Sequence, residues 1–198
     1  MPCFVRLTSA ATHDVTFIKG LKLPAGSYLT FDKGYFDYHQ YGTWTAVKVN
    51  WITRLKKSGA YTVIGENSVG QISKTKGVTK DAIILLGYKQ RPSDKQVEAR
   101  LVTYKDKKTE KLFEFITNNK KLKPETIAAI YQNRWQIEIL FKRVKQNFPL
   151  SYFLGDNANA IKIQIWVCLI ADLLIKYLKA KLRSSWSFTH LTSIVRIH

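Results

Sequence analysis

The sequence predicts an α/β protein, and three observations support this fold class. Two β-prone segments, "YLTF" (28–31) and "VNWITRLKK" (49–57), are separated by a segment with helical character. Short β-prone segments between Gly- and Lys-rich turns then occupy about residues 59–115. Two long helices are predicted after them, an amphipathic one over 122–148 and a second one with a basic tail over 158–183. A chain of 198 residues is long enough for one domain with its own core.

The elements before residue 59 follow from local composition. The β-rich "CFVRLTS" (3–9) predicts a strand, and residues 13–20 predict a short helix that ends at a glycine. "YLTF" predicts a strand that leads directly into Asp32. The polar, aromatic stretch 36–47 predicts a helix, and the strand over 49–57 follows it.

The region of about residues 59–115 is predicted to form β-hairpins rather than another strand–helix–strand unit. Its β-prone pieces are "YTVIG", "DAIILLG", "EARLVTY" and "KLFEFIT". The basic stretch "SKTKGVTK" (73–80) is predicted to be a loop. The glycines of this region match no phosphate-binding loop, so the sequence does not support a nucleotide-binding motif.

The C-terminal part is predicted to be helical. Pro124 suits the first turn of the helix over 122–148, and Glu125 complements its dipole. The most apolar run, "IWVCLIADLLI" (165–175), is too short for a membrane span and predicts a buried helix. No membrane association is expected. "SFTHLTSIVRIH" predicts the start of a third helix.

The charge of the chain indicates a polyanionic partner. Lys and Arg number 32 against 14 Asp and Glu, which gives a net charge of +18. Nucleic acid is the leading partner for such a chain, since its phosphates release counterions when Lys and Arg bind them. A basic ribosome-associated protein remains an alternative. Cys3 and Cys168 indicate neither a disulfide framework nor a zinc site. With no signal peptide pattern, a cytoplasmic, nucleoid-associated location is expected.

The predicted helix over 122–148 carries an ordered row of polar residues. At about 100° per residue, Tyr131, Arg134, Glu138 and Lys145 fall within a sector of about 60° beside the apolar stripe. Taken alone, Arg134 and Glu138 are as readily explained by a routine surface ion pair. A functional interpretation of the row needs a second carboxylate.

Asp32 is the candidate for that carboxylate. It is predicted at the carboxyl end of a strand, where α/β sheets bind their ligands. Taken alone, an aspartate at this position is more often a turn or cap residue. Together, Asp32 and Glu138 could hold Mg²⁺ or Mn²⁺, which prefer oxygen ligands.

These residues give the sequence its resemblance to a known family. "YQNRWQIEILFKRVK" (131–145) matches the Tyr-(2)-Arg-(3)-Glu-(6)-Lys signature of bacterial insertion-sequence DDE transposases, insertion sequence family four. "FDKGYFDY" resembles the segment that carries the second catalytic aspartate of that family. The resemblance implies a ribonuclease H-like catalytic core with a β-rich insertion, here about residues 59–115, before the glutamate-bearing helix.

The resemblance also implies roles for single residues. Asp32 and Glu138 would be the catalytic residues and the ligands of Mg²⁺ or Mn²⁺. Tyr131, Arg134 and Lys145 would hold the DNA strand. The implied reaction is metal-dependent cleavage at transposon ends followed by strand transfer to target DNA. A homodimer in a synaptic complex is an expected assembly.

One catalytic residue of the family has no counterpart here. The first aspartate of its triad lies upstream of the segment with which this chain begins, and the chain ends inside a predicted helix. Residues 1–198 are therefore expected to be a partial DDE domain that is inactive as an isolated chain. The alternative is a non-catalytic DNA-binding module or an inhibitor of transposition derived from a transposase. The β-rich region contains no tryptophan, so no base-flipping residue is assigned.

Overall fold

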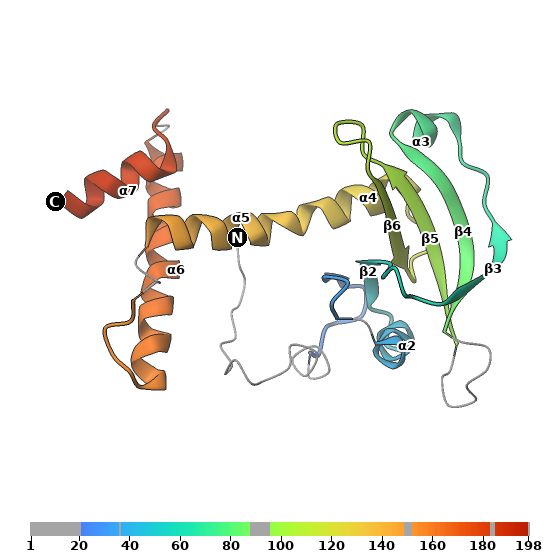
Figure 1. Ribbon diagram of the computed structural model, residues 1–198, viewed down its shortest axis with the longest axis horizontal. Coiled ribbons are helices and arrows are strands. Elements are labelled where there is room, and N and C mark those ends of the chain that lie inside the picture. Colours follow the sequence, from blue (N-terminus) through green and yellow to red (C-terminus); the bar gives the residue numbers. More distant parts are fainter. Residues whose placement is uncertain (1–20, 36, 88–95, 149–151, 183–184, 198) are drawn as a thin grey trace. The chain divides into compact units, whose positions relative to one another are not determined.

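The computed structural model of the chain forms two compact units that divide between Trp135 and Gln136 (Figure 1). It describes residues 21–35, 37–87, 96–148, 152–182 and 185–197. The strand and helix predicted over residues 3–9 and 13–20 lie outside the described residues.

The first unit is built on one six-stranded mixed sheet. Its strands are β1 (Tyr28–Thr30), β2 (Asn50–Arg54), β3 (Tyr61–Glu66), β4 (Val78–Leu86), β5 (Val97–Lys105) and β6 (Leu112–Thr117). They lie in the order β1-β2-β6-β5-β4-β3. β1 pairs parallel with β2, and the other neighbours pair antiparallel. The α/β class is confirmed. A ribonuclease H-like core, and an insertion over about residues 59–115, stay predictions.

Two helices cover opposite faces of this sheet. Alternate strand residues point to opposite faces, and this alternation separates two apolar clusters. Trp51, Leu101 and Ile116 pack with α2 (Tyr38–Ala46), whereas their neighbours Ile52, Val102 and Phe115 pack with α4 (Pro124–Asn133). The Tyr41 ring of α2 stacks on Trp51 with centroids 4.6 Å apart. The sheet is therefore the middle of three layers.

A short helix replaces part of a predicted loop. The basic loop expected over 73–80 is instead the end of α3 (Gln71–Thr75) and the start of β4. Gly77 separates the two elements with φ of +102°, which favours glycine. A Cβ there would lie 2.5 Å from the Lys105 carbonyl oxygen, so α3 and the end of β5 meet closely at this point.

A buried ion pair joins β4 to β5 in the middle of the sheet. Arg100 Nε and Nη2 donate to the two carboxylate oxygens of Asp81 at 2.8 and 2.6 Å. Asn67 Nδ2 donates to the same carboxylate at 3.0 Å. Arg100 Nη1 reaches the carbonyl oxygen of Leu122 at 2.6 Å. Because Leu122 lies two residues before α4, this network fixes the start of that helix on the sheet.

The helix predicted over 122–148 is two helices. α4 ends at Asn133 and α5 (Trp135–Asn147) begins two residues later, although Arg134 keeps α-helical dihedral angles. The Arg134 N–H donates to the carbonyl oxygen of Tyr131, three residues back, at 3.0 Å. Such a bond is that of a 3₁₀ turn, which tightens the chain where the two units divide.

The second unit consists of α5 from Gln136 onward, α6 (Ala158–Lys181) and α7 (Phe188–Ile197). Leu140 and Val144 of α5 pack against Cys168 and Leu169 of α6. Burial raises the pKa of the Cys168 thiol, so this side chain stays neutral in the packed face.

The prediction of a buried helix over 165–175 is wrong for the described structure. Only one side of α6 is covered, and Val167, Ile170 and Leu174 are each more than half exposed. By length and composition alone α6 could cross a membrane. Asp172 in its middle is buried and paired with Arg143 at 2.6 Å and with Lys176 at 3.1 Å. Such pairing is typical of a helix packed against protein.

Candidate functional site

Asp32 lies two residues beyond the carboxyl end of β1. The preceding residue, Phe31, is buried, and its carbonyl oxygen accepts a 2.9 Å hydrogen bond from Thr53 Oγ1 of β2. The Tyr35 N–H donates to the Asp32 carbonyl oxygen at 3.0 Å and closes a turn after the strand. Asp32 itself is half-buried, and the following Lys33 and Gly34 are exposed. The carboxylate is thus held at the strand edge with open surface beside it.

Tyr131 and Arg134 lie near this carboxylate in the same unit. The Arg134 guanidinium lies over the Tyr131 ring at 5.3 Å from its centroid. Burial raises the pKa of the Tyr131 phenol; the Arg134 and Arg54 guanidinium groups oppose the shift and the Asp32 carboxylate adds to it. Asp32, Arg54 and Arg134 are therefore all within electrostatic range of one hydroxyl, which stays protonated at neutral pH.

The Tyr131 ring is part of the core. It is 1% exposed and packs against Phe115 with centroids 5.0 Å apart. A DNA base therefore cannot stack on this ring in the structure described. A role for Tyr131 in DNA binding stays a prediction. Its hydroxyl is buried as well, so its support of Arg134 is the route that the structure leaves open.

Glu138 and Lys145 belong to the second unit. Both side chains are exposed on α5, seven residues apart, which places them two turns apart on one side of the helix. Asp32, Tyr131 and Arg134 belong to the first unit. That Asp32 and Glu138 hold one metal ion together stays a prediction. Within the part of the chain that the structure describes, no three His, Cys, Asp or Glu side chains gather to hold a metal ion.

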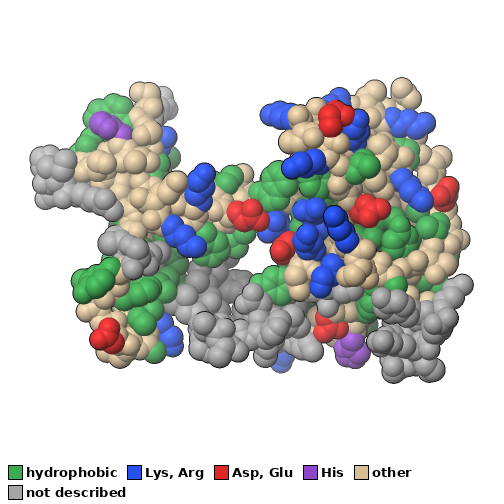
Figure 2. All heavy atoms as spheres, viewed as in Figure 1, with side chains coloured by type: hydrophobic (Ala, Val, Ile, Leu, Met, Phe, Trp, Pro, Cys, Tyr) green, Lys and Arg blue, Asp and Glu red, His purple; other side chains and the backbone are tan. Residues whose placement is uncertain are grey.

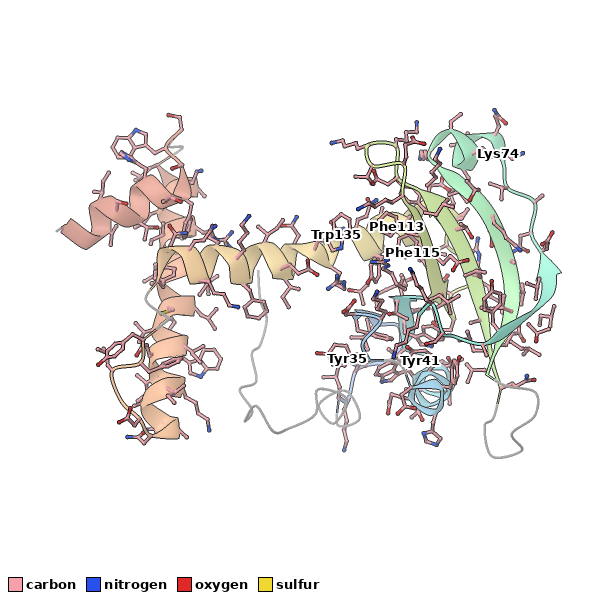
Figure 3. The ribbon with its side chains drawn as sticks, in the orientation of Figure 1. Tyr35, Tyr41, Lys74, Phe113, Phe115 and Trp135 are labelled. Atoms are coloured by element: carbon pink, nitrogen blue, oxygen red, sulfur yellow. The ribbon has the colours of Figure 1, made fainter. Side chains whose placement is uncertain are left out.

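The structure adds Arg54 to the site, which the sequence reasoning did not single out. Its guanidinium lies 4.8 Å from the centroid of the Phe113 ring, and Phe113 meets Trp135 edge to face at 6.3 Å. Figure 3 shows Phe113, Phe115 and Trp135 gathered beside the sheet. The signal in the sequence was the position of Arg54, the last residue of a strand that ends at the same edge as β1.

The fold and the site define a mixed α/β domain with Asp32 and Arg54 at the same strand ends and with the Arg134 guanidinium over the Tyr131 ring. The family model described as "Transposase DDE domain" matches residues 1–174. The chain belongs to this family of transposase DDE domains.

Three relatives agree with this assignment. The chain is 31% identical over 180 residues to a Sinorhizobium fredii protein named as transposase y4zB, with 88% of this chain and 49% of the relative covered. It is 39% identical over 90 residues to a Synechocystis protein named as a transposase for insertion sequence element IS4SA, covering 42% and 26%. It is 28% identical over 179 residues to a Geobacillus stearothermophilus protein named as a transposase for IS5377, covering 90% and 46%.

These matches cover only part of each relative. The chain spans about half the length of the first and third of these relatives. No solved structure matches it.

Proposed function

We propose that this domain acts in DNA transposition, within a complete transposase that cleaves DNA at transposon ends and joins the freed 3′-hydroxyl to target DNA. The observation that carries the proposal is the match of the transposase DDE domain model to residues 1–174, in a structure whose parallel strands β1 and β2 bring Asp32 and Arg54 to the same end of the sheet. The names of the three relatives and the net charge of +18 support it. The Tyr-Arg-Glu-Lys signature and the ribonuclease H-like core belong to the same proposal.

Asp32 and Glu138 would hold Mg²⁺ or Mn²⁺. Both side chains are carboxylates, and hard cations such as these prefer oxygen ligands. Asp32 is half-buried beside exposed residues, and Glu138 is exposed on α5. When bound, the ion supplies positive charge to the reacting phosphate and activates the attacking water. The two carboxylates therefore account for the catalytic part of the proposal.

The cations would hold the DNA strand. Arg134 can fork onto a phosphate with two hydrogen bonds, and the Tyr131 ring beneath it limits the positions its side chain can take. Arg54 is oriented in the same way by Phe113. Lys145 would supply a point charge from α5. Oriented guanidinium groups position a phosphate better than a flexible lysine can.

Arg134→Ala should weaken DNA binding by the chain about 10- to 100-fold, because one charge-assisted phosphate contact is worth about 1–3 kcal/mol. Arg134→Lys should recover only part of this loss, since a lysine cannot form the forked contact. Binding is measured by fluorescence anisotropy on labelled duplex DNA. Lys162→Ala on α6 is the control and should change the affinity little. Equal affinities for the Arg134→Ala variant and the parent would remove Arg134 from the DNA-binding site.

The proposed function itself is tested with a complete transposase that carries this domain. Incubated with Mg²⁺ and duplex DNA that ends in the transposon sequence, it should leave a free 3′-hydroxyl at that end. Retardation of the DNA without any cleavage would favour the non-catalytic DNA-binding alternative.

A further inference from the structure

The pairing of the strands places one end of each of β1, β2, β6, β5 and β4 on the same side of the sheet. We call this line of strand ends the edge. β1 and β2 run parallel, so Asp32 and the residues after Arg54 follow strand ends at the same edge. β6 pairs antiparallel with β2 and therefore begins at this edge, where the β5–β6 turn also lies. Val78 at the start of β4 pairs with Tyr104 near the end of β5, which brings α3 to this edge as well. Figure 1 shows α3 and the β5–β6 turn at the same end of the long strands.

Nine cations occupy this edge, and we call them the basic edge. They come from the end of β2 and the residues after it, from the end of β5 and the β5–β6 turn, and from α3 and the residue that follows it. Its members are Arg54, Lys56, Lys57, Lys74, Lys76, Lys105, Lys107, Lys108 and Lys111. All eight lysines are exposed. Figure 2 shows Lys and Arg side chains gathered over the face of this unit that is in view, and Figure 3 labels Lys74 beside α3.

The acidic side chains near the basic edge offset only part of its charge. Lys105 pairs with Glu110, and Lys76 lies 3.6 Å from Glu125. Glu114 is exposed on β6. Asp106 accepts from the backbone N–H groups of Thr109 and Lys108, which hold the pKa of its carboxyl below the usual range.

Six lysines of the basic edge make no ion pair with any described residue. They are Lys56, Lys57, Lys74, Lys107, Lys108 and Lys111. Like charges gathered in this way repel one another unless a polyanion binds them. The basic edge therefore has the electrostatic character of a phosphate-binding surface.

The dimensions of the basic edge fit a short stretch of duplex. Neighbouring strands lie about 4.8 Å apart, so the four steps from β1 to β4 cover about 19 Å. B-form DNA rises about 3.4 Å per base pair, and about five to six base pairs span this distance.

We propose that the basic edge binds the phosphate backbone of duplex DNA over about five to six base pairs on one side of Asp32. This inference rests on the proposed function, since DNA rather than another polyanion is chosen because the edge leads to the proposed catalytic aspartate. The lysines position the duplex without reading its sequence, because phosphate contacts carry no base information. Arg54 links the basic edge to the site at Tyr131.

The test compares two variants of equal charge in the 198-residue chain. The turn variant, Lys107→Gln/Lys108→Gln/Lys111→Gln, removes three lysines of the basic edge, and the control variant, Lys162→Gln/Lys179→Gln/Lys181→Gln, removes three from α6. Affinity for a duplex of about 20 base pairs is measured without divalent metal over a range of salt concentrations. The slope of log K against log salt should become shallower by about 2–3 in the turn variant and by less than about 1 in the control.

The outcomes separate this inference from the proposed function. If the parent chain binds duplex DNA but the turn and control variants change the slope equally, the inference is overturned and the assignment of Asp32 and Glu138 is untouched. If the parent does not bind DNA, the inference also fails, whereas the proposed function fails only if the complete transposase neither binds nor cleaves the transposon end. Tighter binding of duplex RNA than of duplex DNA by the parent would overturn the choice of DNA. If the turn variant unfolds, Lys56→Gln/Lys57→Gln, just after β2, takes its place. Its slope of log K against log salt should become shallower than that of the control variant, and an equal change would overturn the inference.

Discussion

Glu138→Gln in a complete transposase that carries this domain should lower the rate of strand cleavage at the transposon end by about a thousandfold or more. The amide has nearly the shape of the carboxylate but no negative charge with which to hold a divalent cation. Asp32→Asn should have an effect of similar size. The rate is measured from the first minutes of cleavage of end-labelled duplex DNA in Mg²⁺.

Two controls keep this prediction specific. Glu66→Gln on the edge strand β3 removes an exposed carboxylate whose partner is Lys80, and it should leave the cleavage rate nearly unchanged. DNA retardation by the Glu138→Gln variant should persist, since Glu138 is exposed and its replacement disturbs no core. A cleavage rate within a few-fold of the parent for either Glu138→Gln or Asp32→Asn would remove that residue from the catalytic site.

Arg100→Met should lower the free energy of unfolding of the chain by about 3–5 kcal/mol. The Asp81 carboxylate is 4% exposed, and without Arg100 it would remain buried with only the Asn67 amide to hydrogen-bond its charge. The carbonyl oxygen of Leu122 would also lose its donor, so α4 should be held less firmly on the sheet. Urea unfolding followed by tryptophan fluorescence and circular dichroism measures the change.

The matched control for Arg100→Met is a pair at the surface. Lys120 pairs with Glu98 where both side chains are about half exposed, and Lys120→Met should cost less than about 1 kcal/mol. The double variant Asp81→Leu/Arg100→Met removes both buried charges and should be more stable than Arg100→Met alone. Equal losses for Arg100→Met and Lys120→Met would show that the buried pair does not hold the sheet together.

The parts of the fold that were predicted from the sequence depend on local signals. The alternation of β-prone and helix-prone segments located β1, α2 and β2, and the change to short β-prone segments located β3 to β6. Asp32 was placed correctly at a strand end because the strand and the following turn are adjacent in the chain. The resemblance to DDE transposases was recognised from the spacing of four residues on one predicted helix, and membership of the DDE domain family is confirmed by the match over residues 1–174.

The features of the fold that were not predicted from the sequence depend on contacts between residues that are distant in the chain. No local pattern places β6 beside β2, yet this pairing brings the β5–β6 turn to the edge where Asp32 lies. The 3₁₀ turn at Arg134 interrupts a stretch whose apolar periodicity continues on both sides. The exposed side of α6 also escaped prediction, because hydropathy shows that a helix has an apolar surface but not how much of it is covered.

The central claim is that Asp32 and Glu138 are ligands of the catalytic metal ion, and a change of metal preference tests it most directly. In the complete transposase, Asp32→Cys and Glu138→Cys should each lose cleavage in Mg²⁺ and regain part of it in Mn²⁺, because a thiolate binds the softer ion better. Glu66→Cys should cleave equally well in both. Full activity of Asp32→Cys or Glu138→Cys in Mg²⁺ would contradict the account.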